Sequence, residues 1–393
     1  MKLTFIHPAE KVKLDYNGNY YTDGSYSEDI WNMYLKVFSS ITLIMRKDIK
    51  IYSEEEAKKK FNIIPLNKIQ LRFIPNQSNS VLTYLNPRLK KDKNLIIEEA
   101  IKESDAVILR IPGYSKGIDL AKQYKKPYLV EAVGCPWDTL WNHSIKGKIL
   151  APLAYFRMRQ TIRSASNVIY VTSKFLQHRY PNSYNNIGCS DVRLKSIDHT
   201  KLLARIKQIQ ESQNSKLVIG TAGGVGVKYK GQQYIIKALY ELQKNGCCDF
   251  EYQIAGNGDS SYLQSLVDKY GLHDCVKFVG SIPHDNIFTW FSQLDIYVQP
   301  SKTEGLPRAL VEAMSCATPS MGSIVGGIPE LLSDEVLFKA GNIQQIKSVL
   351  LKMRDRDFRI KQAELNFNTS QNYQVDILEK KRIEFMQKVF LKK

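Results

Sequence analysis

The sequence predicts an α/β protein of two successive units, each with a parallel sheet and crossover helices. Two observations lead to this prediction. Short apolar runs alternate with longer stretches of helical character along the chain, which is the pattern of repeated strand–helix–strand units. The chain also has 393 residues, which is more than one compact core usually holds, so two domains are expected.

Short apolar runs mark the expected strands of both units. In the first unit they are residues 3–7, 41–45, 71–75, 106–111, 128–133 and 167–172. In the second unit they are residues 216–223, 250–256, 276–280 and 295–301, with weaker candidates at 318–322 and 335–338. Helical stretches fall between them, as at residues 231–244, 260–270 and 307–316. Strands and helices that alternate in this way indicate a parallel sheet in each unit.

A change in sequence character places the expected domain boundary. Residues 187–198 lack a clear repeat of apolar positions, and domains usually meet in such irregular stretches. We therefore expect an N-terminal domain at residues 1–195 and a second domain at residues 196–372. A last helix is expected at residues 373–393, after the strands of the second domain are complete.

The formal net charge of +17 at pH 7 is concentrated at the two ends of the chain. Residues 1–200 hold 31 Lys and Arg against 19 Asp and Glu, residues 201–350 hold 14 of each, and residues 351–393 hold 11 against 6. Because the last helix shares the basic character of the first unit, we expect it to pack back on that unit. A basic surface attracts anionic lipids, nucleic acid or phosphorylated substrates; a solvated lysine-rich surface is the alternative.

Other features of the composition indicate a globular protein of the cytoplasm. Hydrophobic residues make up 43% and charged residues 24% of the chain, as in ordinary soluble proteins. No apolar run reaches the roughly 18–20 residues that span a bilayer. The apolar stretch in the first residues, MKLTFIHPAEK, is too short for a signal peptide. The six cysteines form no C-x-x-C pair, so neither disulfides nor a zinc site is expected. The protein is expected in the cytoplasm, with the inner face of the cell membrane as a candidate location.

The strongest local signal is the stretch QPSKTEGLPRALVEAMSCATPSMGSIVGGIPELL at residues 299–332. An expected strand ends here, a polar loop follows, and Pro307 stands at the first turn of the next helix, a position that proline favours. A second strand, a glycine loop and a second proline-led helix start at Pro329 come next. Ligands of open α/β sheets bind at the edge where strands end, and helix N-termini favour phosphate.

Two carboxylates of this stretch, Glu304 and Glu312, indicate more than a phosphate site. A carboxylate beside a phosphate would repel it, but it can accept hydrogen bonds from sugar hydroxyls placed next to the phosphate. We therefore interpret Glu304 as a ligand of a hexose and Glu312 as a ligand of a ribose, with a diphosphate across Gly305 and Leu306. The alternative is a surface loop and a glutamate that stabilises the first turn of its helix.

A glycine-rich stretch at residues 220–242 follows another expected strand and contains Lys228 and Lys230. Glycines let the backbone approach a phosphate and lysine supplies a positive charge; a solvated basic turn is the alternative. The stretch has neither P-loop spacing nor G-x-G-x-x-G. IAGNGD at 254–259 and FVGSIPH at 278–284 are two more glycine-containing strand ends. Together the four loops predict one pocket for a nucleotide diphosphate in the second unit.

These motifs resemble glycosyltransferase family 4, the retaining group 1 glycosyl transferases of the GT-B fold. The resemblance covers most of residues 216–332. It implies two Rossmann-like domains that face each other across a cleft, with an acceptor in the first domain and a nucleotide sugar in the second. It also implies that neither a metal nor another cofactor is required. The matching pieces are Lys230 with Gly231, GNG at 256–258, Pro300 with Ser301, Glu304 and Glu312 within EGLPRALVEAM, and VGGIPE.

The resemblance implies roles for individual residues. Lys230 would offset the charge of the diphosphate, Glu304 would orient the transferred sugar and Glu312 would bind the ribose. The nucleobase would lie near residues 280–282, and a loop containing Gly24 would close on the donor phosphate. The expected donor-binding residues are Gly24, Gly224, Lys228, Lys230, Gly256, Gly258, Ser281, Ile282, Ser301, Glu304, Gly305, Leu306, Pro307 and Glu312.

Two positions depart from the family pattern. Many members have an arginine six residues before the motif lysine, where this chain has Gly224, so Lys228 is expected to substitute for it. Many also have a histidine after the buried strand of the first domain, where this chain has Val133 and Gly134. Asp138 is the candidate for the missing acceptor-side group, and the alternative is a loop aspartate that caps a helix.

One segment of the first unit has two interpretations. Residues 146–163 mix apolar residues at 149, 153 and 156 with Arg157, Arg159 and Arg163. They form either a helix packed on its own sheet or a surface helix that rests on an anionic membrane holding a lipid-linked acceptor.

The sequence therefore predicts a retaining glycosyltransferase that moves a hexose-type sugar from a nucleotide sugar to a glycan or a polyprenyl-diphosphate-linked acceptor. The basic first domain suits such an acceptor, as in capsule, O-antigen or exopolysaccharide biosynthesis. The expected catalytic residues are Glu304, Lys230 and Asp138. One alternative is an epimerase of the same fold, for which Glu131 and Asp138 are the available acid–base groups. Another is a non-enzymatic protein that binds nucleic acid or an anionic membrane, although the neutral charge of residues 201–350 argues against nucleic acid.

Overall fold

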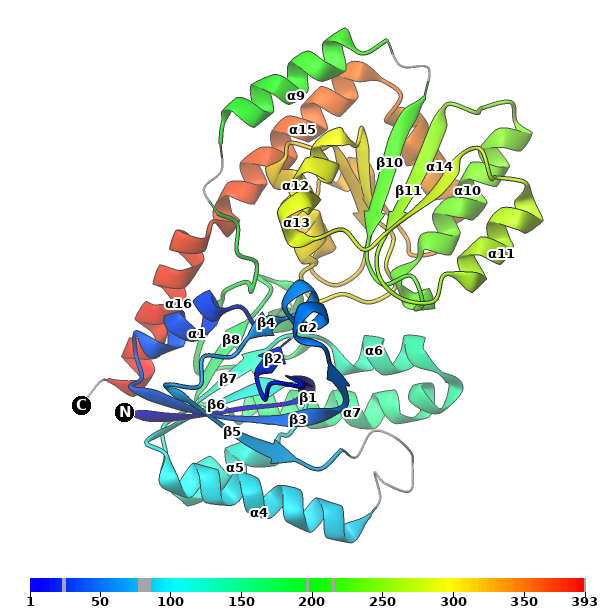
Figure 1. The fold of residues 1–393 in the computed structure, drawn as a ribbon. Helices are drawn as coiled ribbons and strands as arrows, with labels where there is room; N and C mark the ends of the chain where they lie inside the picture. Colours follow the sequence, from blue (N-terminus) through cyan, green and yellow to red (C-terminus); the bar gives the residue numbers. More distant parts are fainter. Residues whose placement is uncertain (23–25, 77–85, 196–197, 214–215, 392–393) are drawn as a thin grey trace.

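The computed structural model describes residues 1–22, 26–76, 86–195, 198–213 and 216–391. Figure 1 shows two α/β units stacked one above the other, with both ends of the chain at the first unit. The prediction of two α/β units with parallel sheets is confirmed by the strand pairing of the described residues. Residues 196 and 197, at the predicted domain boundary, lie outside the described part of the chain, so that boundary stays a prediction.

The first unit is built on a parallel sheet with the strand order β5, β3, β1, β6, β7, β8, β9. Two short antiparallel strands, β2 and β4, extend it beside the second half of β1. All six residues of β6 are buried, because helices cover both faces of the sheet. The strands are β1 Lys2–Asp15, β2 Tyr20–Thr22, β3 Ser40–Tyr52, β4 Asn62–Ile63, β5 Ile69–Ile74, β6 Ala106–Ile111, β7 Tyr128–Ala132, β8 Asn167–Tyr170 and β9 Asn185–Gly188.

Helices of the first unit bury a separate apolar core on each face of its sheet. One core joins alternate strand residues such as Val107 and Leu109 to α4, α5 and α7. The other joins Ile108 and Leu129 to α1 and to the last helix of the chain. The helices are α1 Glu28–Leu35, α2 Glu54–Lys60, α4 Pro87–Glu103, α5 Lys116–Gln123, α6 Pro136–His143, α7 Ile145–Arg163 and α8 Phe175–Arg179.

The second unit has its described strands in the parallel order β12, β11, β10, β13, β14, β15. Ligands of such doubly wound sheets bind at the carboxyl ends of the strands where the order reverses, which is here between β10 and β13. The strands are β10 Leu217–Ala222, β11 Phe250–Ala255, β12 Val276–Gly280, β13 Ile296–Gln299, β14 Ser320–Ser323 and β15 Leu337–Phe338. The helices are α9 Thr200–Glu211, α10 Gln232–Lys244, α11 Ser261–Tyr270, α12 His284–Gln293, α13 Arg308–Ser315, α14 Ile343–Lys352 and α15 Arg356–Ser370.

The structure corrects one predicted element. Each predicted strand coincides with a strand of the structure. The bounds differ most for β1, which ends at Asp15 rather than at residue 7, and for β3, which ends at Tyr52 rather than at residue 45. The prediction of a helix that begins at Pro329 is wrong, because the segment forms only the single 3-10 turn η2, Ile328–Glu330. The turn ends there because the chain must reach the short turn η3, Asp334–Val336, and then β15.

The last helix, α16 Val375–Phe390, packs on the first unit although it follows the second in sequence (Figure 1). Phe385, Met386 and Phe390 are buried in the core beneath α1. The crossing segment is fixed to the other interdomain connection by a parallel bridge between Leu194 and Gln374. The chain therefore passes between the units twice, at two places that lie side by side.

Buried charges join α16 to the first sheet. Arg382 donates hydrogen bonds to Glu131 Oε1 at 2.6 Å and to Asp191 Oδ1 at 2.7 Å. Arg110 reaches both carboxylates from β6, with Nη1 3.5 Å from Glu131 Oε2 and Nη2 bonded to Asp191. Arg382 and Glu131 are only 4% and 1% exposed. Glu131 is thus a structural anchor for α16, which removes it as the acid–base group that an epimerase would need.

His7, at the end of the first core segment of β1, is expected to make the stability of the protein depend on pH. Its Nδ1 lies 2.7 Å from the hydroxyl of Tyr26, and burial, with Arg110 nearby, lowers its pKa from 6.5 to about 3. His7 is therefore protonated at about pH 6.5 in the unfolded chain but only at about pH 3 in the folded chain. This contribution to stability is full above pH 6.5 and is lost as the pH falls through that window.

We expect the protonation of His7 in the unfolded chain to lower the free energy of unfolding by about 1.4 kcal/mol as the pH falls from 7.5 to 5.5. Urea unfolding of the wild type and of His7→Gln at the two pH values measures the effect. The variant is expected to lose less stability than the wild type over this range. His143→Gln, at an exposed position of α6, serves as the matched control. The same pH dependence in the wild type and His7→Gln would contradict the expectation.

Candidate active site

Lys230 and Glu304 form an ion pair at the carboxyl edge of the second sheet. Lys230 ends the 3-10 turn η1, Lys228–Lys230, which follows β10, and Glu304 lies in the loop between β13 and α13. The Lys230 Nζ donates to Glu304 Oε1 at 2.7 Å. The two loops leave neighbouring strands where the strand order reverses, so the pair lies where sheets of this kind bind ligands.

The Glu304 carboxylate is held by buried polar side chains. Gln299 Nε2 donates to it at 3.0 Å and Ser301 Oγ at 2.6 Å. Tyr297 in turn donates to Gln299 Oε1 at 2.8 Å, which fixes the orientation of that amide. Within the described residues, every recorded donor to this carboxylate reaches Oε1. The second oxygen, Oε2, therefore remains available to accept hydrogen bonds from a ligand.

A close backbone contact holds the lysine turn against the glutamate loop. Gly231 has a φ of +84°, and a Cβ atom on it would lie 2.0 Å from the carbonyl oxygen of Pro300. The N–H of Lys302 donates to the carbonyl of Tyr229 at 2.7 Å. Only glycine fits at residue 231, which explains the Lys230–Gly231 pairing seen in the sequence.

The glycine turns after β10 and β11 also meet at this edge. Gly256 has a φ of +153°, and a Cβ atom there would lie 1.9 Å from the carbonyl oxygen of Gly223. Gly224 faces the carbonyl of Asn257 on the same side, and Gly258 lies against Gly226. The structure thus brings the predicted residues Gly224, Gly256 and Gly258 together where the two glycine turns pack backbone against backbone.

Glu312 lies on the helix that follows the Glu304 loop. It lies half-buried on α13, which begins after Pro307. Burial raises the pKa of the Tyr297 hydroxyl well above 10, and the charges of Glu304 and Glu312 raise it further. Both carboxylates are therefore near enough to act electrostatically on the Tyr297 hydroxyl.

Other predicted donor residues lie around or outside this centre. Ser281 is exposed and Ile282 is half-buried in the loop after β12. The Lys228 Nζ lies 4.1 Å from the ring centroid of Tyr262 on α11, so it does not join the Lys230–Glu304 pair. Gly24 lies outside the described residues. The roles predicted for all of these residues stay predictions.

Asp138 lies in the first unit, and its helix contacts the Glu304 loop, because Asn142 Nδ2 donates to the carbonyl oxygens of Asp138 at 2.8 Å and of Lys302 at 3.2 Å. Asp138 belongs to the first turn of α6, and its carboxylate lies 3.2 Å from Arg179 Nη2. Burial raises its pKa, and the nearby Arg179 opposes that rise. Among the described residues no recorded contact joins Asp138 to Lys230 or Glu304. Its predicted catalytic role stays a prediction.

The two units touch directly at the candidate site. A Cβ atom on Gly305 would lie 2.7 Å from the carbonyl oxygen of Val133, at the end of β7. The Glu330 carboxylate accepts hydrogen bonds from the backbone N–H groups of Ser173, Lys174 and Phe175, at 2.6, 3.0 and 2.6 Å. The loop that follows Glu304 is thus enclosed between the ends of the two sheets.

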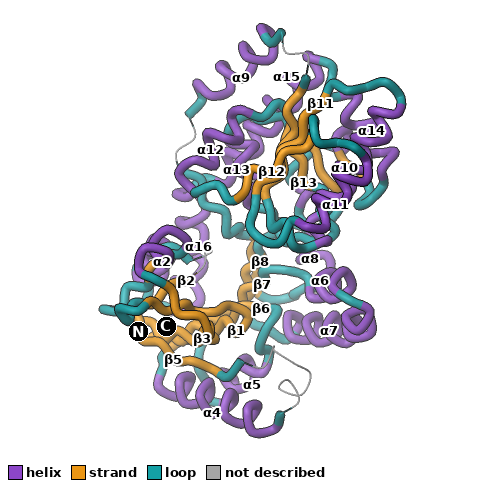
Figure 2. The backbone as a smooth tube through the Cα atoms, turned by 45° about the vertical axis from the view of Figure 1, so that its right-hand side comes forward, coloured by secondary structure: helices purple, strands orange, loops and turns teal. Residues whose placement is uncertain are grey.

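Helix α7 differs from the interpretation that its apolar residues pack on the sheet. Ile149, Leu153 and Phe156 are 75%, 47% and 64% exposed, so that alternative is wrong for the residues singled out in the sequence. The helix packs instead through Met158 and Ile162. Figure 2 shows α6 and α7 projecting as a pair from the end of the first sheet. Within the described chain, no helix has both the length and the apolar character needed to cross a membrane.

Sequence reasoning missed several side chains of the site. Gln299 is the last residue of β13, and a polar residue at a buried strand end was the available signal. Glu330 lies within the VGGIPE motif that the sequence had already marked. The segment SKFLQHRY at residues 173–180 contains basic and aromatic residues. It follows the end of β8, at the carboxyl edge of the first sheet. The rule that ligands bind at strand ends, applied to the first unit, would have found them.

Comparisons with known proteins point to one enzyme family. Residues 216–355 match the family model described as Glycosyl transferases group 1. The chain is 33% identical over 362 residues to Protein CapJ of Staphylococcus aureus, covering 89% of this chain and 85% of CapJ. It is 37% identical over 134 residues to the amylovoran biosynthesis glycosyltransferase AmsK of Erwinia amylovora, covering 32% of this chain and 33% of AmsK.

A solved structure shows the same arrangement of both units. Anabaena HepE in complex with UDP-glucose superposes with a TM-score of 0.64 at 16% identity, covering 99% of this chain and 100% of HepE. The likeness therefore extends over the whole fold, whereas the family match is confined to the unit that holds Lys230, Glu304 and Glu312.

Proposed function

The chain belongs to the group 1 glycosyl transferases and has the GT-B fold, and from this premise we propose which sugar transfer it performs. The donor is a nucleoside diphosphate linked to a hexose-type sugar, and the sugar is transferred with retention of its anomeric configuration. The acceptor is a growing surface polysaccharide, because AmsK, a relative, is named for amylovoran biosynthesis. These relatives favour neither an epimerase nor a non-enzymatic binding protein.

The observation that supports this proposal most strongly is the geometry of Glu304. Its Oε1 is occupied by Lys230, Gln299 and Ser301, while Oε2 is left for a ligand. A carboxylate held in this way accepts hydrogen bonds from sugar hydroxyls in one fixed orientation. The Lys230 ammonium has three donor hydrogens, so it can contact a phosphate while it stays paired with Glu304.

The neighbouring groups supply the rest of a donor site. The diphosphate lies along the backbone of Gly305 and Leu306, near the N-terminal end of α13, where free N–H groups favour anions. Lys230 offsets the negative charge that grows on the diphosphate as the sugar leaves, which is the largest kind of contribution in such reactions. Glu312 binds the ribose hydroxyls. In this account the lysine and the backbone N–H groups neutralise the leaving group without a metal.

Contact between the units protects the reaction from water. Gly305 lies against Val133, and Glu330 is bound by the backbone at the start of α8. A donor held beneath this contact is shielded from hydrolysis until an acceptor hydroxyl reaches it.

A panel assay tests the proposed function. The purified chain is incubated with UDP-, GDP- and ADP-linked hexoses and with a lipid extract of a polysaccharide-producing bacterium. UDP-glucose is first in the panel because HepE was determined with it. We expect one donor to release its nucleoside diphosphate and to label the lipid or glycan fraction. Failure of every donor to support either reaction would contradict the proposal.

The outer face of α7 supports contact with an anionic membrane on the cytoplasmic side. Ile145, Ile149, Leu153 and Phe156 follow one another at helical spacing and are 81%, 75%, 47% and 64% exposed. Lysines and arginines flank this row, as in helices that lie in the interface of anionic bilayers. A lipid-linked acceptor would be presented to the enzyme at this surface.

Vesicle binding tests the membrane contact. The wild type is expected to cosediment with phosphatidylglycerol vesicles, more weakly at high salt, and not with phosphatidylcholine vesicles. Ile149→Ser combined with Phe156→Ser is expected to weaken this binding at least about tenfold, because both side chains would be buried in the interface. Leu203→Ser, which is 69% exposed on α9, is the matched control. Unchanged binding of the double variant would remove α7 from the membrane surface.

A further inference from the structure

The side-chain amide of Asn142, on α6 of the first unit, reaches the loop of the second unit that carries Glu304. Its Nδ2 atom donates to the carbonyl oxygen of Lys302 at 3.2 Å and to that of Asp138, one turn earlier on α6, at 2.8 Å. An amide nitrogen carries two hydrogens, so each of these bonds uses one of them. A carboxylate has no hydrogen to donate and a hydroxyl has only one, so this position suits an asparagine.

The Lys302 peptide is also bound by the turn that carries Lys230. The N–H of Lys302 donates to the carbonyl oxygen of Tyr229 at 2.7 Å, and Lys230 follows Tyr229 directly. The Lys302 ammonium lies 5.0 Å from the ring centroid of Tyr234 on α10, so the contact with α6 is made by the backbone. The peptide thus joins α6 of the first unit to the lysine turn of the second, two residues before Glu304.

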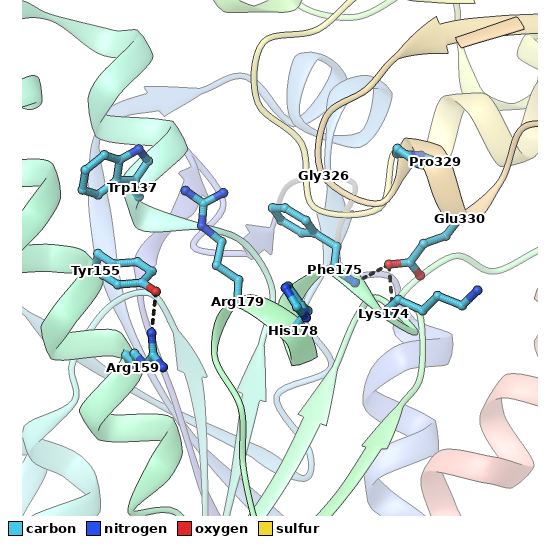
Figure 3. A pocket seen from close by; sticks show the side chains of 10 residues that line it. All are labelled: Trp137, Tyr155, Arg159, Lys174, Phe175, His178, Arg179, Gly326, Pro329 and Glu330. Carbon is cyan, nitrogen blue, oxygen red and sulfur yellow. Dashed lines mark hydrogen bonds between the residues drawn. The ribbon is translucent and has the colours of Figure 1, made fainter. Parts of the chain in front are cut away.

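Helix α6 is fixed against α7, so Asn142 has a defined position. Figure 3 shows the Trp137 ring of α6 beside the Tyr155 ring of α7, and the two rings meet edge-on with their centroids 5.9 Å apart. The connection between the helices is tight, because a Cβ atom on Gly147 would lie 2.1 Å from the carbonyl oxygen of Leu140. An amide on a helix held in this way can keep a peptide of the other unit in one position.

Other contacts hold the two units together independently of Asn142. The Glu330 carboxylate of the second unit accepts hydrogen bonds from the N–H groups of Lys174 and Phe175 in the first (Figure 3). Helix α16 also packs on the first unit after the chain has left the second. Loss of the bond from Asn142 would therefore free the Lys302 peptide without separating the units.

We propose that Asn142 is a positioning residue for sugar transfer, which holds the Lys302 peptide where Lys230 pairs with Glu304 at 2.7 Å. Asn142 acts through this peptide and not on a substrate. The inference rests on the proposed function and adds that the geometry of the donor-site ion pair depends on the first unit. Binding of the nucleotide relies on residues of the second unit, whereas turnover also needs the contact with α6.

Asn142→Leu replaces the amide by an apolar group of similar size and tests this role. We expect it to lower kcat about tenfold, because the Lys302 carbonyl loses its partner. We expect the Kd of whichever of UDP, GDP and ADP the wild type binds to stay within about twofold. His143→Gln, exposed on the same helix, is the matched control and is expected to keep wild-type kcat. Unchanged kcat in Asn142→Leu would overturn the proposal, and so would a Kd that weakens as much as kcat falls.

A double variant shows whether Asn142 acts through the ion pair. Glu304→Gln already breaks the pair, so adding Asn142→Leu to it is expected to lower kcat by less than about twofold more. A further loss of about tenfold in the double variant would mean that the two effects are independent, which contradicts the proposed role. Asn142→Ala, a residue that favours helices, is expected to behave like Asn142→Leu, so the result does not depend on how the leucine packs.

Hydrogen exchange followed by mass spectrometry tests the contact without any substrate. Peptides that cover residues 300–306 are expected to exchange faster in Asn142→Leu than in the wild type and in His143→Gln, because the N–H of Lys302 is held less firmly. Equal exchange in all three proteins would overturn the proposal even if no donor were known.

These measurements separate the inference from the proposed function. A wild type that binds no nucleoside diphosphate and transfers no sugar would contradict the proposed function itself. A wild type that transfers sugar no faster than Asn142→Leu would contradict only the role of Asn142.

Discussion

Glu304→Gln is expected to lower kcat for sugar transfer by roughly 10²–10³-fold, the usual effect of removing one preorganised charged group from an active site. The amide keeps the size of the side chain but removes the charge that pairs with Lys230 at 2.7 Å. It also replaces the oxygen that would accept a hydrogen bond from the sugar. Steady-state kinetics with the donor identified by the panel measures the effect.

Two controls separate chemistry from folding in this experiment. Glu211→Gln changes an exposed carboxylate on α9 and is expected to keep wild-type kcat. Because the Glu304 carboxylate is only 10% exposed and is held by Lys230, the thermal stability of Glu304→Gln is measured as well, and kcat is compared at a temperature at which both proteins are folded. A variant that folds normally and keeps more than about a tenth of wild-type kcat would rule out the role given to Glu304.

Arg382→Met is expected to lower the free energy of unfolding by about 3–5 kcal/mol, the effect of removing one partner of a buried ion pair. Glu131 would lose a donor at 2.6 Å and Asp191 a donor at 2.7 Å. Arg110 alone would then face two carboxylates, so a net negative charge would be left where water hardly reaches. Urea unfolding followed by circular dichroism measures the change.

Lys388→Met, on an exposed position of the same helix, is the matched control and is expected to change stability by less than about 0.5 kcal/mol. Adding Glu131→Gln to Arg382→Met restores the charge balance, so the double variant is expected to be more stable than Arg382→Met alone. An Arg382→Met protein as stable as the control would show that α16 is held by its apolar face only.

Much of the fold could be predicted because its signals are local. Runs such as AVILRI read directly as buried strands, and loops after strands had to meet at one edge of the sheet. The same rule brought Lys230 and Glu304 to one place although 74 residues separate them. Gly231 was part of the signal because a side chain there would collide with the backbone of Pro300.

Contacts between distant segments could not be predicted in the same way. The pairing of Glu131 with Arg382 spans 251 residues, and nothing local marks two charges that neutralise each other in a core. For α7, the sequence showed which residues share a face but not whether that face meets the sheet or the solvent. The hydrogen bond from Asn142 to Lys302 joins two units that the sequence does not place relative to each other.

Binding of nucleoside diphosphates to the second unit is the most direct test of the account. Calorimetry of the wild type, Glu312→Ala and Glu364→Ala against UDP, GDP and ADP is the measurement; Glu364 is exposed on α15 and serves as the control. We expect one nucleoside diphosphate to bind the wild type and the control, and Glu312→Ala to bind it at least about tenfold more weakly, because a charged hydrogen bond to the ribose is lost. Absence of binding to the wild type, or equal binding to Glu312→Ala, would contradict the account.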